Sequence, residues 1–243
     1  MKLDIVAWGN SIGGLSFRAG ETQGKITAEA FTYSEPVNYR GPRLLAIHQS
    51  GSSGASDVRG PGTAEDAEHE SVPLVIEKKS SGEESAVPEA LAKRREKEPT
   101  LVSLVPLPAN SRRATVLLAP AAEGTFTGYV IDDDPSQLPA GKLRVHNLSP
   151  HTIALQFGNG QKVELARGKT ALAEAPGGQA IYRLAYLADG KWTIQENNIL
   201  PVPENQQTQL IVLKSDNQFF LSTDGASGGY LQTVVLRRQG DPG

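Results

Sequence analysis

The chain contains two related stretches, and this internal repeat constrains its fold more than any other feature. Lys2-Leu3-x-Ile5 near the start recurs as Lys142-Leu143-x-Val145. Leu15-Ser16-Phe17-x-x-Gly20 recurs as Leu155-Gln156-Phe157-x-x-Gly160, at the same offset of about 140 residues. Two copies of one unit predict two similar domains. Such an organisation favours a binding or structural module over an enzyme with one asymmetric site.

A second pair of matching stretches shows where the copies differ. Residues 106–110 and 116–118 match residues 201–205 and 211–213, with an offset of only about 95. The first copy therefore carries an insertion of about 45 residues, which we place at residues 49–100. Its first part is rich in Gly, Ser, Asp and Glu, which predicts a mobile loop.

Two ordered elements are expected within or beside this insertion. Residues 72–78 have the composition of a strand. Residues 88–98 predict a short helix, because proline opens the stretch, basic residues follow toward its end, and Pro99 stops it. A partly disordered or helical insertion is therefore expected in the first copy.

The remaining pattern predicts an all-β protein. Short runs rich in Val, Ile, Thr, Phe and Tyr are separated by Gly, Pro, Asn and Asp in both copies. Asn159-Gly160 and Asp189-Gly190 are typical of type I′ hairpin turns. We expect two tandem antiparallel Ig-like β-sandwich domains, at residues 1–134 and 142–243, joined by a polar linker at residues 135–141.

Composition excludes several classes of function. The chain has no cysteine, which removes disulfides, thiolate catalysis and cysteine metal sites. Its net charge of -3 leaves no basic excess to attract nucleic acid. No apolar run approaches the roughly 18 residues that a spanning helix needs, so we expect no membrane span.

One repeated pair of side chains is a candidate ligand site. Tyr39-Arg40 and Tyr182-Arg183 follow the matching prolines Pro36 and Pro176. An aromatic ring beside a cation in each copy suggests two equivalent sites, for example for stacking on sugar rings. The alternative, which we favour, is that each tyrosine anchors a corner of its sandwich, as in Ig-like folds.

The acidic run before the linker is a candidate calcium site. Asp132 and Asp134 supply the hard oxygen ligands that calcium prefers. The spacing matches no EF-hand loop, however, and consecutive residues cannot all point at one ion, so a solvated linker is the alternative. His146 and His151 lack a third zinc ligand at matching spacing, and His146 is expected to face outward.

No catalytic residue is predicted. The chain has no G-x-S-x-G elbow, and no glycine-rich phosphate loop follows a strand. A site assembled in space from carboxylates or histidines leaves no such trace. The runner-up function is therefore a β-sandwich hydrolase or lyase in which His48, His146 or His151 converges with carboxylates.

The junction between the copies resembles a known repeat family. Arg144-Val145-His146-Asn147-Leu148-Ser149-Pro150 is similar to the strand R-V-x-N-x-S-P that opens the repeats of a bacterial cell-surface family of tandem Ig-like β-sandwiches with no known function. The following hairpin, residues 154–160, resembles that family as well. The first copy departs from the motif, with Gly9-Asn10-Ser11 at this place. The resemblance implies a secreted or envelope-anchored protein with no catalytic residues to carry over.

Together these observations lead us to expect a non-enzymatic binding or structural module of the bacterial envelope or exterior. Its partner is expected to be a protein or a polysaccharide, bound through edge strands, the insertion or aromatic side chains. A subunit of a symmetric assembly is a further alternative, and the oligomeric state is open. We expect a periplasmic or extracellular protein whose leader preceded Lys2, although a cytosolic start fits nearly as well.

Overall fold

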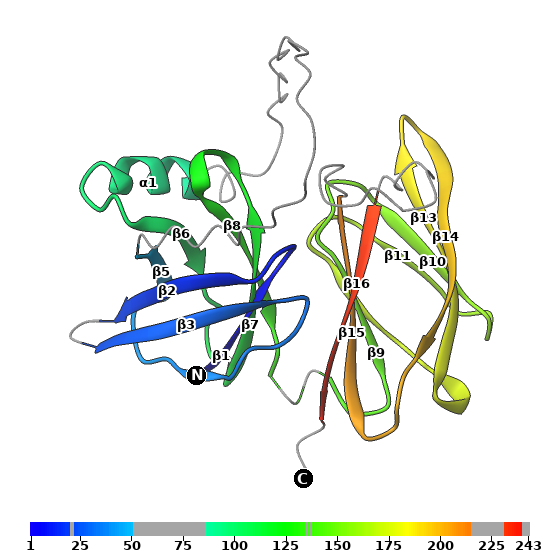
Figure 1. Ribbon diagram of the computed structural model, residues 1–243. Coiled ribbons are helices and arrows are strands. Elements are labelled where there is room, and N and C mark those ends of the chain that lie inside the picture. The colour runs from blue at the N-terminus through cyan, green and yellow to red at the C-terminus, as the bar shows by residue number, and fades with distance from the viewer. Residues whose placement is uncertain (20–21, 51–85, 135, 137, 215–230, 240–243) are drawn as a thin grey trace, which may run out of the picture.

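The computed structural model describes residues 1–19, 22–50, 86–134, 136, 138–214 and 231–239. These residues form a mostly β protein whose two halves, β1–β8 and β9–β16, lie side by side (Figure 1). The strands of the first half are β1 (Lys2–Ala7), β2 (Ile12–Ala19), β3 (Thr22–Ala30), β4 (Val37–Asn38), β5 (Leu44–Gln49), β6 (Leu101–Pro106), β7 (Arg113–Pro120) and β8 (Phe126–Asp132).

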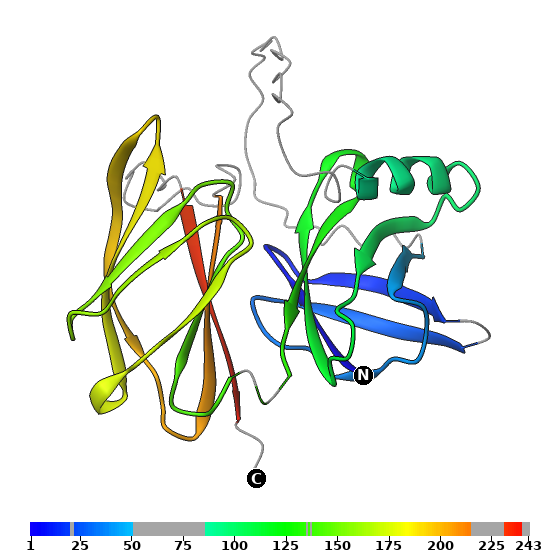
Figure 2. The same ribbon diagram turned by 180° about the vertical axis from the view of Figure 1, so that it is seen from behind.

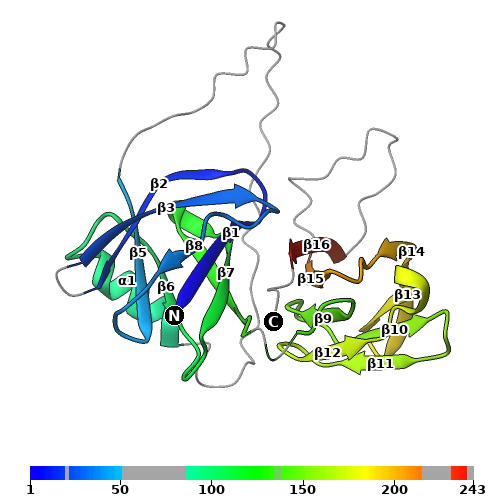
Figure 3. The same cartoon turned by 90° about the horizontal axis from the view of Figure 1, so that it is seen from below.

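The second half consists of two packed sheets. Its strands are β9 (Leu143–Asn147), β10 (Ile153–Phe157), β11 (Lys162–Leu165), β12 (Thr170–Ala173), β13 (Gln179–Ala188), β14 (Lys191–Pro201), β15 (Gln206–Lys214) and β16 (Leu231–Gln239). In the described residues, these strands form sheets of four in the orders β11-β10-β13-β14 and β12-β9-β15-β16. Figure 3 shows the two layers.

The first half repeats this strand pairing element by element. β6-β5-β2-β3 corresponds to β14-β13-β10-β11, and β4-β1-β7-β8 corresponds to β12-β9-β15-β16. The difference is a short parallel contact between β1 and β3, which joins the two sheets of the first half. Each half also contains a parallel pair, β1 with β7 and β9 with β15, where we expected antiparallel pairs throughout.

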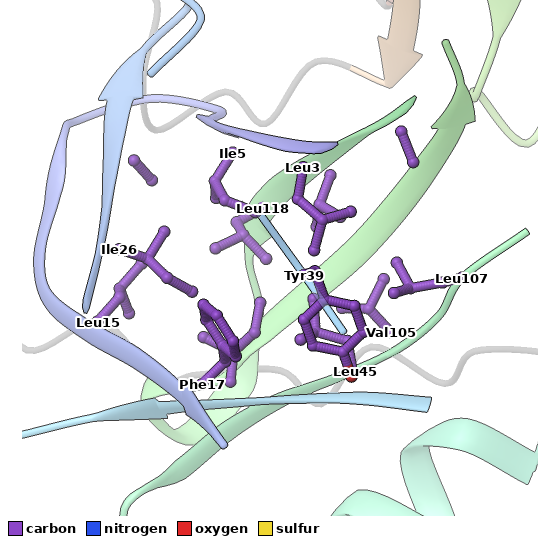
Figure 4. Close-up of a cluster of buried hydrophobic side chains, with 14 of the residues drawn as sticks. Leu3, Ile5, Leu15, Phe17, Ile26, Tyr39, Leu45, Val105, Leu107 and Leu118 are labelled. Carbon is purple, nitrogen blue, oxygen red and sulfur yellow. The ribbon is translucent and has the colours of Figure 1, made fainter. Parts of the chain in front are cut away.

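Each half has its own apolar core. In the first half, Leu3, Leu15, Phe17, Leu45 and Leu118 come from four strands and point toward one another (Figure 4). The second half has an equivalent core, which includes Leu143, Leu155, Phe157, Leu184 and Leu210. Alternating apolar side chains of the two facing sheets fill both cores, as the period-two pattern of the sequence predicts.

The insertion lies where the repeat indicates. It connects β5 to β6, at the position where the second half has only the tight turn between β13 and β14. The helix α1 (Ala86–Arg95) confirms the predicted short helix, but it begins and ends slightly earlier than the predicted range of residues 88–98. Its Val87, Ala90 and Leu91 pack on a small buried cluster of Ala46, Leu101 and Leu104. Figure 2 shows the helix beside the strands of the first half. The strand expected at residues 72–78 lies outside the described residues.

The two predicted hairpin turns differ in outcome. Asp189 and Gly190 both have positive φ, 50° and 73°, which confirms the type I′ turn between β13 and β14. The prediction for Asn159-Gly160 is wrong, because Gly160 has positive φ (86°) and Asn159 does not. The hairpin loop enclosed by Phe157 and Gln161 has three residues, Gly158 to Gly160, instead of the two of a type I′ turn. Across this loop the Phe157 N–H donates to the Gln161 carbonyl at 2.8 Å.

The halves are joined by a third apolar cluster. Val6, Trp8, Leu117 and Ile131 of the first half pack against residues of β15 and β16, namely Ile211, Leu213, Val234 and Leu236. The connection between the halves is also held in place: Leu138 is fully buried, and its carbonyl accepts a hydrogen bond from the Gln207 side chain at 2.6 Å. The two sandwiches therefore form one packed unit rather than two units on a solvated linker.

Candidate functional site

The two tyrosines of the predicted ligand site are buried. Tyr39 is 4% exposed, packs edge-on against Phe17 and donates its hydroxyl to the Pro42 carbonyl at 2.7 Å. Tyr182 is 3% exposed and donates its hydroxyl to Glu196 Oε1 at 2.6 Å. Burial, and then the bond to Glu196, raise the pKa of the Tyr182 phenol. Neither ring offers an exposed face on which a sugar can stack.

The two tyrosines also occupy different places in the repeat. Phe17 of β2 pairs with Ile47 of β5, whereas the matching Phe157 of β10 pairs with Tyr182 of β13. The counterpart of Tyr182 is therefore Ile47, and Tyr39 lies in the segment that follows β4. Their neighbours Arg40 and Arg183 are exposed at these unequal positions. The strand register does not place the Tyr-Arg pairs in two equivalent sites.

Protein groups surround Asp132 and Asp134, the two residues of the candidate calcium site. Asp134 forms an ion pair with Arg112 at 3.1 Å and accepts bonds from Ser136, and these contacts hold its pKa well below the ordinary range. Asp132 accepts a bond from Ser111 Oγ at 2.7 Å. Asp133 points elsewhere, into the contact between the halves. Within the described residues, no three acidic or histidine side chains form a group that could hold a metal ion.

His146 lies on the face of β9 opposite Leu143 and Val145, as expected, but it is not at the molecular surface. His146 is 2% exposed, and its Nε2 lies 2.6 Å from Gln209 Oε1. Strand β9 belongs to the sheet that packs against the first half, so both faces of the strand are covered. Burial, and then the nearby Arg144 cation, lower the pKa of His146 to about 3. The imidazole is therefore neutral and donates from Nε2.

A buried polar network crosses the contact between the halves at Arg238. This β16 side chain lies 3.0 Å from Asp4 of β1 and 2.9 Å from Asp133, both of which are 1% exposed. Its guanidinium stacks over the Tyr33 ring at 4.1 Å. Gln209 extends the network, because its Nε2 donates to Asp133 at 2.8 Å. These groups hold one another and leave no side chain aimed at a ligand.

The unusual surface of the molecule is the outer face of β13 and β14. Ile181, Ile194 and Ile199 are 49%, 58% and 60% exposed, and Trp192 is 46% exposed. We call this surface, together with Arg183 and Asn197 between the isoleucines, the β13–β14 face. Large apolar side chains grouped on one sheet face mark an interaction surface more often than a solvated one.

Strand register and one bulge bring these residues together. Ile181 pairs with Ile199, Ala185 with Ile194, and Leu187 with Trp192. The pairing shifts between Leu184 and Ala185, so Gln195 is an extra residue on β14. In a regular strand, Ile194 and Ile199 would point to opposite faces, because they are five positions apart, an odd offset. The bulge turns both outward, which is why the pattern of the sequence alone does not reveal this face.

A groove runs across one end of the β13–β14 face. It has a volume of about 820 Å³, and Ile181 and Ile199 line it together with planar polar side chains. Arg183 is the charged residue of the groove and donates to Asn197 Oδ1 at 2.9 Å. Amides and a guanidinium between apolar walls suit the backbone and side chains of a peptide.

β14 also has a free edge, because it ends the order β11-β10-β13-β14 in the described residues. Antiparallel pairs alternate between pairs that exchange hydrogen bonds and pairs that do not. Ile181 directs its carbonyl to Gly158 at 2.8 Å, toward β10. Its β14 partner Ile199 therefore directs its own N–H and C=O to the free edge. At this edge, the Ile199 N–H donates a hydrogen bond to Asn198 Oδ1 at 2.8 Å.

Comparison of the chain with models of known protein families and with curated proteins found no match. No helix in the described part of the chain is long and apolar enough to cross a membrane.

Proposed function

We propose that this protein is a non-enzymatic binding module that accepts an extended protein segment on the β13–β14 face and the free edge of β14. In this proposal its two halves are Ig-like repeats of an exported bacterial protein, at the envelope or outside the cell. The observation that carries the proposal is the exposure of Ile181, Ile194 and Ile199 on one sheet face, beside an edge that no strand of the described residues pairs with. A segment that adds a strand gains backbone hydrogen bonds from the edge and apolar contacts from the face.

The chemistry of the face favours a protein over a polysaccharide. Sugar sites use flat exposed rings, and both tyrosines proposed for that role are buried. The exposed apolar groups of the β13–β14 face are instead β-branched isoleucines, with Trp192 at one end. Branched aliphatic side chains pack against other side chains, as they do between strands of neighbouring chains.

An enzymatic role has less support from the geometry. His146 is buried and neutral, with Nε2 bonded to Gln209. His48 lies 3.6 Å from Glu98 and 3.2 Å from Thr100 Oγ1, and burial lowers its pKa. Among the described residues, two pockets on the second half and one beside Met1 are lined by no histidine. A converging acid–base pair in a concave pocket, which the hydrolase alternative needs, is not formed by these residues.

Selection of peptide ligands tests the proposal. A displayed library of random peptides is panned against the dilute, immobilised protein, and enriched peptides are measured for binding. We expect peptides with alternating apolar residues and an acidic residue that can reach Arg183. Their binding should be lost when Ile194→Lys and Ile199→Lys are combined, because the charges replace the apolar surface.

The matched control is Leu172→Lys. Leu172 is 46% exposed, as Trp192 is, but it lies on β12 in the other sheet. This control should bind the selected peptides as the unchanged protein does, and circular dichroism should show that all variants are folded. Failure to enrich any peptide, or equal binding by the double variant, contradicts the proposal.

A further inference from the structure

We propose that the occupant of the β14 edge is β14 of a second copy of this chain. The two strands would pair antiparallel about a two-fold axis at Asn197 and join two four-stranded sheets into one. This inference rests on the proposed function, because it uses the same edge. It adds the identity of the partner and the register of the contact.

The backbone groups needed for this pairing point in the required direction. Ile199 directs its N–H and C=O away from β13, as its bond to Asn198 shows, and Asn197, two residues earlier, shares that direction. Beyond the bulge, the Leu187 N–H bonds the Thr152 carbonyl at 2.9 Å, toward β10. The β14 residues opposite Leu187 and Ala185, which are Trp192 and Ile194, therefore also direct their backbone groups to the free edge.

The bulge makes β14 complementary to itself. With Asn197 opposite Asn197 of the second copy, the next outward-directed pair is Ile199 opposite Ile194 of the second copy, because Gln195 is the extra residue of the bulge. The two-fold axis repeats that pair on the other side. Pro201, which has no N–H, then lies opposite Trp192 of the second copy at the end of the ladder. In every pair both side chains lie on the same face of the joined sheet.

Contacts within the second half hold the bulge in place. The side chain of Gln195 accepts the N–H of Leu231 at 3.1 Å. Glu196, the next residue, accepts bonds from Tyr182 and from Thr233 at 3.2 Å. The shift in register on which the self-pairing depends is therefore fixed by the fold rather than by the partner.

Charge or strand length favours this edge over the other described edges of the second half; β12, for example, has no charge but only four residues. Lys191 at the start of β14 and Glu196 are its charged residues, and Glu196 points inward, so like charges do not meet at the axis. The edge strand β11 has four residues and carries Lys162 and Glu164. The other end of the opposing sheet, β16, carries Arg237 and Arg238. Proteins protect exposed edges with charges and short strands, and β14 has eleven residues with few charges.

Solution mass tests the proposal, with variants that depend on the register. Analytical ultracentrifugation from about 1 μM to about 500 μM should show the mass rise from 25.9 kDa toward twice that value. Ile194→Lys combined with Ile199→Lys places like charges opposite each other twice, and should raise the dissociation constant at least about tenfold. Ile194→Lys combined with Ile199→Glu places opposite charges together twice, and should restore the dimer.

The two proposals can fail separately. A protein that stays monomeric throughout this range, or a dimer that both charge variants affect equally, overturns the self-pairing. If the dilute protein still captures peptides through the β13–β14 face in that case, the binding function stands with another occupant. If peptides and the second copy compete for the same protein, both proposals are supported.

Discussion

At the scale of single residues, the pKa of His146 is strongly lowered, and this shift makes the stability of the protein depend on pH. Its pKa is about 3 in the folded protein and near 6.5 when unfolded, because burial opposes the charged form. The unfolded chain therefore binds the proton first as the pH falls below 6.5. The stability that depends on neutral His146 is complete above pH 6.5 and is lost progressively toward pH 3.

This linkage predicts a difference in acid sensitivity between the unchanged protein and His146→Gln. Each pH unit below 6.5 corresponds to about 1.4 kcal/mol, so the unchanged protein should lose about 2 kcal/mol more than the variant between pH 6.5 and pH 5. Urea unfolding at the two pH values measures both free energies, and other titrating groups cancel in the comparison. Equal losses in the two proteins would show that His146 does not resist protonation.

Residue environments were the least predictable property of this chain. Alternation along β9 assigns His146 to the outside, but it carries no information on what covers that outside, here the first half of the molecule. Tyr39 and Tyr182 both follow matching prolines, Pro36 and Pro176, yet Tyr182 corresponds in strand pairing to Ile47. Asp132 and Asp134 form a local acidic run, whereas their partners Ser111 and Arg112 lie more than twenty residues away.

At the scale of elements, the turn between β9 and β10 explains the sequence Asn147-Leu148-Ser149-Pro150. Asn147 is fully buried, and its Nδ2 donates to the carbonyls of His151 and Leu165 at 2.7 and 2.9 Å. Its Oδ1 accepts from the Ser149 hydroxyl at 2.7 Å. The side chain of one residue thus satisfies the polar groups of a buried turn, so the motif has a structural role here.

Removing that side chain should weaken the second half. Asn147→Ala leaves buried carbonyls and the Ser149 hydroxyl without these bonds, and we expect a loss of about 2–3 kcal/mol in the free energy of unfolding. Asn159→Ala is the control, because its bond to the Gln161 N–H lies in an exposed hairpin loop, and a loss within about 0.5 kcal/mol is expected. Chemical unfolding measures both variants. Similar losses would contradict the role of Asn147.

Elements were more predictable than residues. The repeat offsets and the strand composition locate the paired strands and the position of the insertion, and local turn chemistry identifies the Asp189-Gly190 hairpin. The bulge at Gln195 escapes prediction because it depends on the pairing of β14 with β13 and on the contact with Leu231. That bulge creates the β13–β14 face. The sequence therefore predicts most of the strands that carry the candidate site, but not the site itself.

At the scale of the whole molecule, Arg238 links the two halves through Asp4 and Asp133. Both carboxylates are buried. Without Arg238, Asp4 keeps its ion pair with Arg113 at 2.8 Å, whereas Asp133 keeps hydrogen bonds from Thr115 and Gln209 but loses the cation that lies 2.9 Å away. We expect Arg238→Ala to lower the free energy of unfolding by about 3–5 kcal/mol. Arg237→Ala on the same strand removes an exposed bond to the Pro201 carbonyl and should change it by less than about 0.5 kcal/mol. Denaturant unfolding compares the two, and equal effects would contradict a buried link between the halves.

Residue-resolved hydrogen exchange of β14 tests the central claim most directly. In the dilute protein, the amides of Ile194, Asn197 and Ile199 face the free edge and should exchange faster than those of Thr193 and Asn198, which face β13. When the edge is occupied, by a second copy at high concentration or by a selected peptide, the first three amides should become protected. Protection that appears at another edge, or an unchanged β14 beside a bound partner, would show that binding does not use this strand.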